Sequence, residues 1–201
     1  MPSGSAGQQT GPIVAQAAGC RLDVSVVEAT ADHLTLKYTF HNGSDRNAYI
    51  FNRLYTEIDD SGVFQTEKDR TYVVVEDGGV TLSKKIIAVP PTIDVERPVV
   101  PCTTLVKPGD TTSETITVKL PLIPYTPYLR GAAPAPSSQA EPLKASFEIG
   151  LFLVPPEGDR LAQRIATTDG TAYRFNPASP ASQTILRAGP LPAPLPVRPL
   201  K

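Results

Sequence analysis

An antiparallel, all-β sandwich is the fold that the sequence predicts, on three observations. Apolar and polar residues alternate along several short segments of the 201-residue chain, a pattern typical of strands that bury one face. Turn-forming clusters of Gly, Pro, Asn and Asp separate these segments. The chain also carries 22 prolines, about twice the average usage of ~5%, and proline interrupts long helices.

Residues 33–41 show the alternation most clearly. Leu34, Leu36, Tyr38 and Phe40 fall on one face of the predicted strand, and polar residues fall on the other. The Asn-Gly pair that follows is a strong signal for a tight hairpin. We therefore expect this strand to pair with the next one along the chain.

The other predicted strands are short β-rich runs, each bounded by a turn sequence. The turns read DDSG, DGG, KPGD and Asp-Gly, and the KPGD turn is expected to join two partner strands. The runs cover residues 20–28, 47–58, 63–67, 70–76, 80–89, 102–106, 112–120, 145–154, 160–168, 171–175 and 182–188. We expect one sandwich of roughly nine to eleven strands.

Composition indicates one domain with two flexible ends. Residues 1–19 contain no Lys or Arg and are predicted to form a flexible arm. The sandwich domain is predicted to cover residues 20–188. Within it, residues 121–144 are rich in proline and alanine, so we expect a long surface loop inserted between strands. Residues 189–201, GPLPAPLPVRPLK, are predicted to form a stiff, proline-rich tail.

Charge and hydropathy argue against two classes of partner. The formal net charge is −1 at pH 7, and no run is rich in Lys or Arg, whereas nucleic-acid binding needs a basic surface. No stretch approaches the ~20 apolar residues of a membrane-spanning helix. We therefore expect neither nucleic-acid binding nor a membrane span.

The segment PIVAQAAGC, which ends at Cys20, is similar to the cleavage site of a bacterial lipoprotein. It lacks the basic start and the apolar run that a targeting signal needs, and Ala17 stands where a branched aliphatic residue is expected. We therefore expect no targeting signal in the chain. This predicts the cytoplasm by default, and the cell envelope or secretion if a leader has been removed.

Cys20 and Cys102 are the only cysteines, and both lie at the predicted start of a strand. A disulfide between them would close a long loop, worth roughly 4 kcal/mol in the chain-entropy model. Two free thiols are an equally good interpretation, because the spacing carries no signature. The sequence leaves both alternatives open.

The residues offer little chemistry for catalysis or metal binding. His33 and His41 lie on one predicted strand, roughly 27 Å apart at ~3.4 Å per residue, which is too far to share an ion. The acidic turns lack the ladder of oxygen ligands that calcium requires. No nucleophile elbow or phosphate-binding glycine motif is present. We therefore expect no enzyme activity, no metal site and no cofactor.

Residues 47–55, NAYIFNRLY, are apolar on both faces of their predicted strand. Either another part of the chain covers the aromatic face, or that face binds a partner, since Tyr and Arg are frequent at binding hot spots. Two tyrosines of the predicted insertion are candidates for the intramolecular cover. The candidate partner-binding residues are Tyr49, Phe51, Arg53, Tyr55, Tyr125 and Tyr128.

Two stretches resemble the bacterial immunoglobulin-like sandwich domains. The first is LTLKYTFHNGSDRNAYIFNRLY, with an alternating strand and an N-x-S-D corner. The second is VKPGDTTSETITVKLPL, with a PGD turn before a strand. The resemblance covers about residues 20–188 and implies an immunoglobulin-like antiparallel β-sandwich. It carries no catalytic residues.

These observations favour a non-enzymatic binding or structural module that engages a protein partner through an aromatic sheet face or a sheet edge. Addition of a partner strand to a sheet edge is a known mode of recognition. One alternative is a sandwich that resembles proteinase inhibitors and blocks an enzyme cleft with its long loops. Another is a subunit of a homo-oligomer or larger assembly, tethered by its proline-rich ends.

Overall fold

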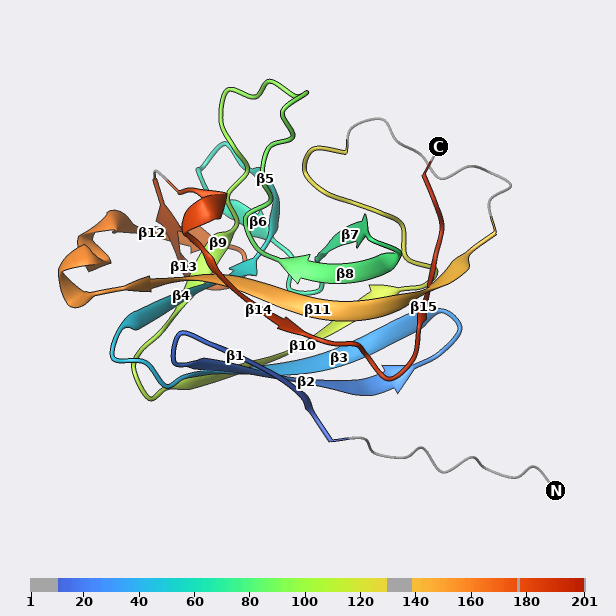
Figure 1. Ribbon diagram of the computed structural model, residues 1–201. Coiled ribbons are helices and arrows are strands. Elements are labelled where there is room, and N and C mark those ends of the chain that lie inside the picture. The colour runs from blue at the N-terminus through green and yellow to red at the C-terminus, as the bar shows by residue number, and fades with distance from the viewer. Residues whose placement is uncertain (1–10, 130–138, 177, 201) are drawn as a thin grey trace.

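The computed structural model describes residues 11–129, 139–176 and 178–200 (Figure 1). Strands make up 56% of the structure and helices 4%, so the all-β prediction is confirmed. Within the described residues, fifteen strands form two sheets. Two short 3-10 turns, η1 (Pro156–Leu161) and η2 (Pro180–Ser182), are the helical elements of this part of the chain.

The smaller sheet has four antiparallel strands and lies below the larger sheet in Figure 1. The third strand, β3, lies at its centre and pairs with β2 on one side and with β10 on the other. The order of the sheet is β1 (Ile13–Ala17), β2 (Cys20–Ala29), β3 (His33–Asn42) and β10 (Thr111–Lys119).

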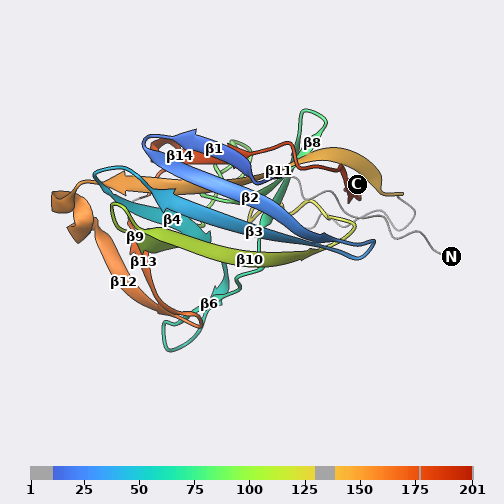
Figure 2. The same ribbon diagram turned by 90° about the horizontal axis from the view of Figure 1, so that it is seen from below.

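The larger sheet is mixed, because β8 runs parallel to β11 and β6 parallel to β12, and it is also curled. Figure 2 shows β6, β12 and β13 bending away from the strands that face the smaller sheet. The order is β5 (Tyr55–Ile58), β6 (Phe64–Thr66), β12 (Ala162–Thr167), β13 (Gly170–Phe175), β9 (Cys102–Val106), β4 (Asn47–Arg53), β11 (Glu141–Val154), β8 (Gly79–Lys84) and β7 (Tyr72–Glu76). Two further strands, β14 (Thr184–Ala188) and β15 (Leu195–Val197), pair with β11.

The two sheets enclose the main hydrophobic core, as a sandwich does. The alternation predicted for β3 is confirmed: Leu34, Leu36, Tyr38 and Phe40 are each at most 1% exposed. On the opposite sheet, Phe147 of β11 stacks on Tyr38 with ring centroids 5.1 Å apart. Burying one large apolar side chain contributes about 1.5–3 kcal/mol, so these inward-facing residues hold the two layers together.

The prediction of hairpins after β3 and after β9 is wrong. β3 and β4 lie in different sheets, and so do β9 and β10, so each connection crosses from one layer to the other. The physical reason lies in β4, whose five central residues are all buried. A strand that is apolar on both faces is stable inside the larger sheet, whereas β3 has one polar face that remains in solvent.

The side chain of Asn42 fastens both crossings and is fully buried. Its Nδ2 donates to the backbone oxygens of Arg46 and Val106, at 2.7 and 2.9 Å. Its Oδ1 accepts from the N–H of Ser44 at 3.1 Å. Its own N–H donates to the backbone oxygen of Asp110 at 3.0 Å. Asn42 of the Asn-Gly sequence therefore links the two crossings through buried hydrogen bonds and does not form a hairpin turn. We call this set of Asn42 hydrogen bonds the polar clamp.

Residues 11–19 are structured, where the sequence predicts a flexible arm. Strand β1 pairs with β2 along its whole length. Ala18 and Gly19 form the turn between them, with φ of 51° and 79°, as in a two-residue hairpin. The sequence that is similar to a lipoprotein cleavage site thus forms a hairpin turn that leads into β2. Residues 1–10 lie outside the described residues.

The described part of the proline-rich tail packs onto the fold, where the sequence predicts a free spacer. Leu191, Leu195 and Val197 are each at most 6% exposed, and β15 pairs with the start of β11. The N–H of Leu122 donates to the backbone oxygen of Pro196 at 2.8 Å. Because proline has no N–H to donate to a neighbouring strand, it is restricted to positions such as this short strand at the edge of a sheet.

Part of the predicted 121–144 insertion also packs onto the sandwich. Tyr125 and Val73 of β7 exchange two backbone hydrogen bonds, of 2.8 and 2.9 Å. Strand β11 begins at Glu141, inside the predicted loop. Residues 130–138 of the insertion lie outside the described residues. The insertion therefore covers part of the outer edge of β7.

Candidate functional site

The chain itself covers the aromatic face of β4, which the sequence leaves open as a partner surface. Tyr49 is 2% exposed and Phe51 is fully buried. The ring of Tyr49 packs edge-on against Tyr173 and Phe175, with centroid distances of 5.5 and 4.9 Å. Phe51 packs in the same way against Phe152 at 4.9 Å. These contacts come from β13 and β11 instead of the predicted insertion, so neither Tyr49 nor Phe51 offers surface to a partner.

Of the other predicted tyrosines, Tyr55 of β5 packs edge-on against Phe64 with ring centroids 5.0 Å apart, and Tyr125 lies at the outer edge of β7. Tyr72 of this strand lies beside Tyr125, with ring centroids 6.0 Å apart. The guanidinium of Arg70 stands over the Tyr125 ring, 4.9 Å from its centroid. Burial, followed by the nearby Tyr125 and Tyr55 hydroxyls, raises the pKa of Tyr72 well above its usual range. Tyr128 is buried in the same neighbourhood.

Arg53, the remaining predicted residue, belongs to a polar cluster between the sheets that we define as Tyr38, Asn52, Arg53, Lys84 and Glu114. Tyr38, Asn52 and Lys84 are buried, and Arg53 and Glu114 are half-buried. Glu114 is its centre: Asn52 Nδ2 donates to Oε1 at 2.9 Å. The Arg53 guanidinium pairs with the same oxygen at 3.2 Å. The Tyr38 hydroxyl donates to Oε2. The cluster joins β3 and β10 of the smaller sheet to β4 and β8 of the larger one.

Lys84 is a fully buried member of this cluster. Its Nζ donates to the backbone oxygens of Asn52 and Lys68, at 3.1 and 2.7 Å. Burial lowers the pKa of Lys84 to about 8, and the nearby Glu114 carboxylate opposes that shift. At neutral pH this amine therefore has a larger neutral fraction than an exposed lysine, whose pKa is ~10.4.

Both cysteines are free thiols and both are buried. Cys20 belongs to the main core between the sheets, and Cys102 packs in a separate cluster with Phe64 and Ala172. Burial raises the pKa of Cys102 to about 12. Of the two alternatives that the sequence leaves open, the structure therefore contains free thiols, shielded from solvent and weakly nucleophilic.

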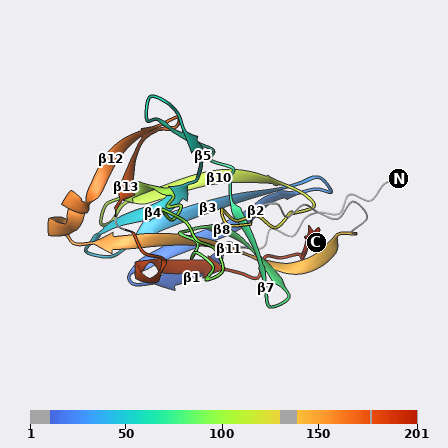
Figure 3. The ribbon, with the colours of Figure 1, turned by 90° about the horizontal axis from the view of Figure 1, so that it is seen from above.

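Strand β7, which Figure 3 shows from above, is the last strand at one end of the larger sheet. Val73 directs its N–H and C=O outward to Tyr125. Because the backbone alternates along a strand, Val75 directs its N–H and C=O to the same side. In the described part of the chain no backbone group bonds Val75 there, and its side chain is 41% exposed. The outer edge of β7 is therefore paired with Tyr125 at Val73 and open at Val75.

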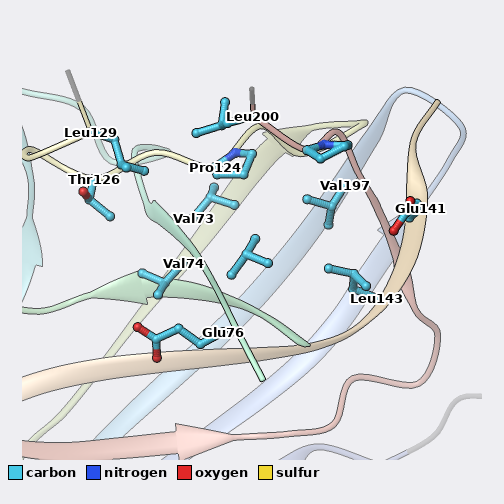
Figure 4. Close-up of a pocket in the computed structure, with 12 residues that line it drawn as sticks. Val73, Val74, Glu76, Pro124, Thr126, Leu129, Glu141, Leu143, Val197 and Leu200 are labelled. Atoms are coloured by element: carbon cyan, nitrogen blue, oxygen red, sulfur yellow. The ribbon is translucent and has the colours of Figure 1, made fainter. Parts of the chain in front are cut away.

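An apolar pocket of about 450 Å³ opens beside this edge (Figure 4). Its walls come from β7, the segment after β10, the start of β11 and the end of the chain. Pro124, Leu143 and Val197 contribute to the aliphatic lining, and the carboxylates of Glu76 and Glu141 add negative charge. The volume lies in the range of sites that bind small molecules or side chains, ~300–1,000 Å³.

Sequence reasoning did not single out the edge of β7 or Lys84, although each has a signal. Val73, Val74 and Val75 form a run that is apolar on both faces, which is unusual for the last strand of a sheet. Lys84 follows Val80 and Leu82 at a spacing of two. A lysine in register with core residues indicates either the end of a strand or a buried cation.

Metal ligands, membrane helices and known relatives give no further assignment. Across residues 11–129, 139–176 and 178–200, no group of three or more His, Cys, Asp or Glu side chains is placed to hold a metal ion. None of the helices in this part of the chain is long and apolar enough to span a membrane. Comparisons with protein-family models, curated proteins and solved structures give no match.

Proposed function

We propose that this protein is a non-enzymatic binding module that takes up an extended segment of a protein partner at the outer edge of β7. The observation that best supports the proposal is the position of Val75. It is exposed, it continues an edge that already has one bridge, to Tyr125, and it lines the apolar pocket. An extended peptide suits such an edge because its own N–H and C=O groups complete the hydrogen bonds of the strand.

The other borders of the sheets support the choice of β7. On β10, the N–H of Thr117 donates to Asp69 Oδ1 at 3.0 Å. β15 is bridged by Leu122, and β1 lies beside β14. β5, at the opposite end of the larger sheet, has only four residues, and short edge strands are poor templates for pairing.

The pocket indicates the chemistry of the partner segment. Alternate side chains of a peptide on β7 would point toward the aliphatic lining, which favours Val, Leu or Ile at those positions. The carboxylates of Glu76 and Glu141 favour a Lys or Arg in the same segment. We therefore expect a partner segment with alternating aliphatic residues and a basic residue.

We also propose that the domain is immunoglobulin-like. The two-layer arrangement supports this, as do the crossings between the sheets after β3 and after β9. The parallel pairing of β8 with β11 is a departure from the antiparallel sheets of that fold.

Peptides selected from a random displayed library against the full chain test the binding role. Val75→Pro removes the outward N–H, and we expect it to weaken the selected peptides about tenfold, through a lost hydrogen bond and a clash with the incoming strand. Fluorescence anisotropy with a labelled peptide measures this loss. The free energy of unfolding is expected to change by less than about 1 kcal/mol, because proline is tolerated on an edge strand.

Val75→Thr is the matched control, since it keeps the N–H and nearly the same shape, and it is expected to retain peptide binding. A library that yields no binding peptide contradicts the proposal, as do peptides that bind Val75→Pro and the unmodified chain equally well. Concentration-dependent dimers that Val75→Pro abolishes would show that a second copy occupies the edge, which is the assembly-subunit alternative.

A further inference from the structure

The segment 123–127, which we call the strap, contacts the outer edge of β7 through its middle residue. Tyr125 exchanges backbone hydrogen bonds of 2.8 and 2.9 Å with Val73. If this antiparallel bridge continued, Ile123 would lie opposite Val75, but within the described residues no backbone hydrogen bond joins those two. The strap therefore occupies the edge of β7 at Val73 and leaves it open at Val75.

The strap turns away from β7 because both of its ends are fixed elsewhere. Leu122, just before it, is buried and bonds the backbone of Pro196 and Arg198, at 2.8 Å each. Tyr128, just after it, is also buried, and its hydroxyl accepts the N–H of Val99 at 3.0 Å. The residues between these two anchors are half-buried or exposed. The strap is thus fixed at both ends, and its middle residue supplies the hydrogen bonds to β7.

Alternate residues of the strap face two pockets, one on each side of it. Pro124 and Thr126 line the apolar pocket of about 450 Å³ (Figure 4). Ile123 and Tyr125 line a second pocket, of about 440 Å³. Val73 of β7 lines both. Removing the strap from the edge would therefore join the two pockets into one groove along β7.

We propose that the strap is an internal ligand of the β7 edge and that the partner segment binds by replacing it. This inference rests on the proposed function at the same edge. A segment that paired with Val75 alone would gain the hydrogen bonds of one residue, whereas a segment that also replaces Tyr125 gains those of Val73 as well. The open Val75 lets the segment pair there first. Each bond that the strap then gives up at Val73 is replaced by one to the segment, so Val73 is paired before and after the exchange.

The contacts of Tyr125 indicate what the partner segment must supply. The Tyr125 ring lies 6.0 Å from the ring of Tyr72, which is buried. The Arg70 guanidinium stands over the Tyr125 ring at 4.9 Å and donates to its hydroxyl. A replacing segment without an aromatic residue would expose the Tyr72 ring and leave the guanidinium without its aromatic partner. We therefore expect an antiparallel segment with an aromatic residue opposite Val73 and, two positions earlier, an aliphatic residue opposite Val75.

Hydrogen exchange of the full-length chain with a bound peptide tests this replacement. The probe is a labelled synthetic peptide with the sequence of residues 121–127, PLIPYTP, and a lysine added at each end. Because the peptide is free of the anchor at Leu122, its isoleucine can lie opposite Val75 while its tyrosine lies opposite Val73. When the peptide binds, we expect the Val75 amide to gain protection and the Tyr125 amide of the chain to lose it, while the Val73 amide stays protected.

Variants of the strap change how strongly it competes with the peptide. Tyr125→Ser keeps the backbone bonds but removes the ring from Tyr72 and Arg70. We expect the peptide to bind this variant about tenfold more tightly than the unmodified chain, measured by fluorescence anisotropy, because the open edge is populated more often. Ile123→Ser, at an exposed strap residue, is the matched control and is expected to leave the affinity unchanged. A peptide with serine in place of its tyrosine is expected to bind about tenfold more weakly.

The outcomes separate this proposal from the proposed function. If a peptide, either the probe or one selected from the library, protects Val75 while Tyr125 keeps its protection, the replacement of the strap is overturned and the proposed function stands. Equal affinity of the probe for Tyr125→Ser and for the unmodified chain also overturns the replacement. Selected peptides that release Tyr125 without carrying an aromatic residue overturn the expected partner chemistry. If no peptide protects Val75, both proposals fail.

Discussion

Replacing Asn42 with alanine is expected to lower the free energy of unfolding by about 3–5 kcal/mol. The substitution removes both hydrogen bonds that Nδ2 donates, to the backbone oxygens of Arg46 and Val106, and the two that Oδ1 accepts from Ser44. A buried polar group left without a partner costs about 1–3 kcal/mol. Because Asn42 joins both crossings between the sheets, the loss affects two connections at once. The midpoint of urea unfolding measures this loss of stability, provided that the slope of the unfolding free energy against urea concentration is unchanged.

Two further variants separate the polar clamp from simple loss of volume. Asn42→Asp keeps the shape and the acceptor oxygen but loses both donated hydrogen bonds, so we expect it to be at least as destabilising as alanine. Ser44→Ala removes a hydroxyl that donates to Oδ1 at 2.6 Å and makes two longer, exposed hydrogen bonds to the backbone of Arg46, and we expect a loss of about 1 kcal/mol. Near-normal stability of Asn42→Asp would contradict the clamp.

Replacing Phe147 with alanine is expected to cost about 3–5 kcal/mol, the usual range for a buried phenylalanine. Phe147 is fully buried and stacks on Tyr38 of the other sheet. The substitution therefore opens a cavity where the two layers meet. The same urea measurement applies, and loss of the near-ultraviolet circular dichroism of the tyrosines would accompany any loosening of the core.

Phe147→Leu fills most of that space, so we expect a loss of only about 1–2 kcal/mol. Val75→Ala, on an exposed strand position, is expected to change the stability by less than about 0.5 kcal/mol. If Phe147→Ala cost no more than Val75→Ala, the contact between the sheets could not be the main source of stability.

The positions of the strands could be predicted well from the sequence, because side-chain alternation is a local property. The predicted run 102–106 coincides with β9, and 33–41 differs from β3 by one residue. The DGG and Asp-Gly turns lie where they are predicted, with positive φ at Gly78 and Gly170, and each joins two antiparallel strands. Strand β15 was not predicted, because prolines in its neighbourhood favoured a free tail.

The pairing of the strands could not be predicted in the same way. A bend with good turn residues has the same sequence whether it joins neighbours in one sheet or crosses between two. The outcome at Asn42 depends on Val106, 64 residues away along the chain, and no local signal carries that contact. The two apolar faces of β4 determine that it joins the larger sheet, but only in combination with the strands that cover those faces.

The candidate site was predicted only in part, for a related reason. The sequence singles out Tyr55, Tyr125 and Tyr128, and Tyr125 does lie at the outer edge of β7, where it pairs with Val73. Tyr49 and Phe51 were singled out for the same aromatic character, yet they fill the interior. Whether an aromatic residue is a binding residue or a core residue depends on what the rest of the chain places on it.

Hydrogen exchange at the Val75 amide tests the central claim, an open edge on β7, most directly. In the free protein we expect this amide to exchange with little protection, while the amide of Val74, which lies opposite Thr81 of β8, is protected. A bound peptide is expected to slow the exchange of the Val75 amide markedly. Strong protection of this amide in the free chain, or no change when peptide binds, would contradict the account.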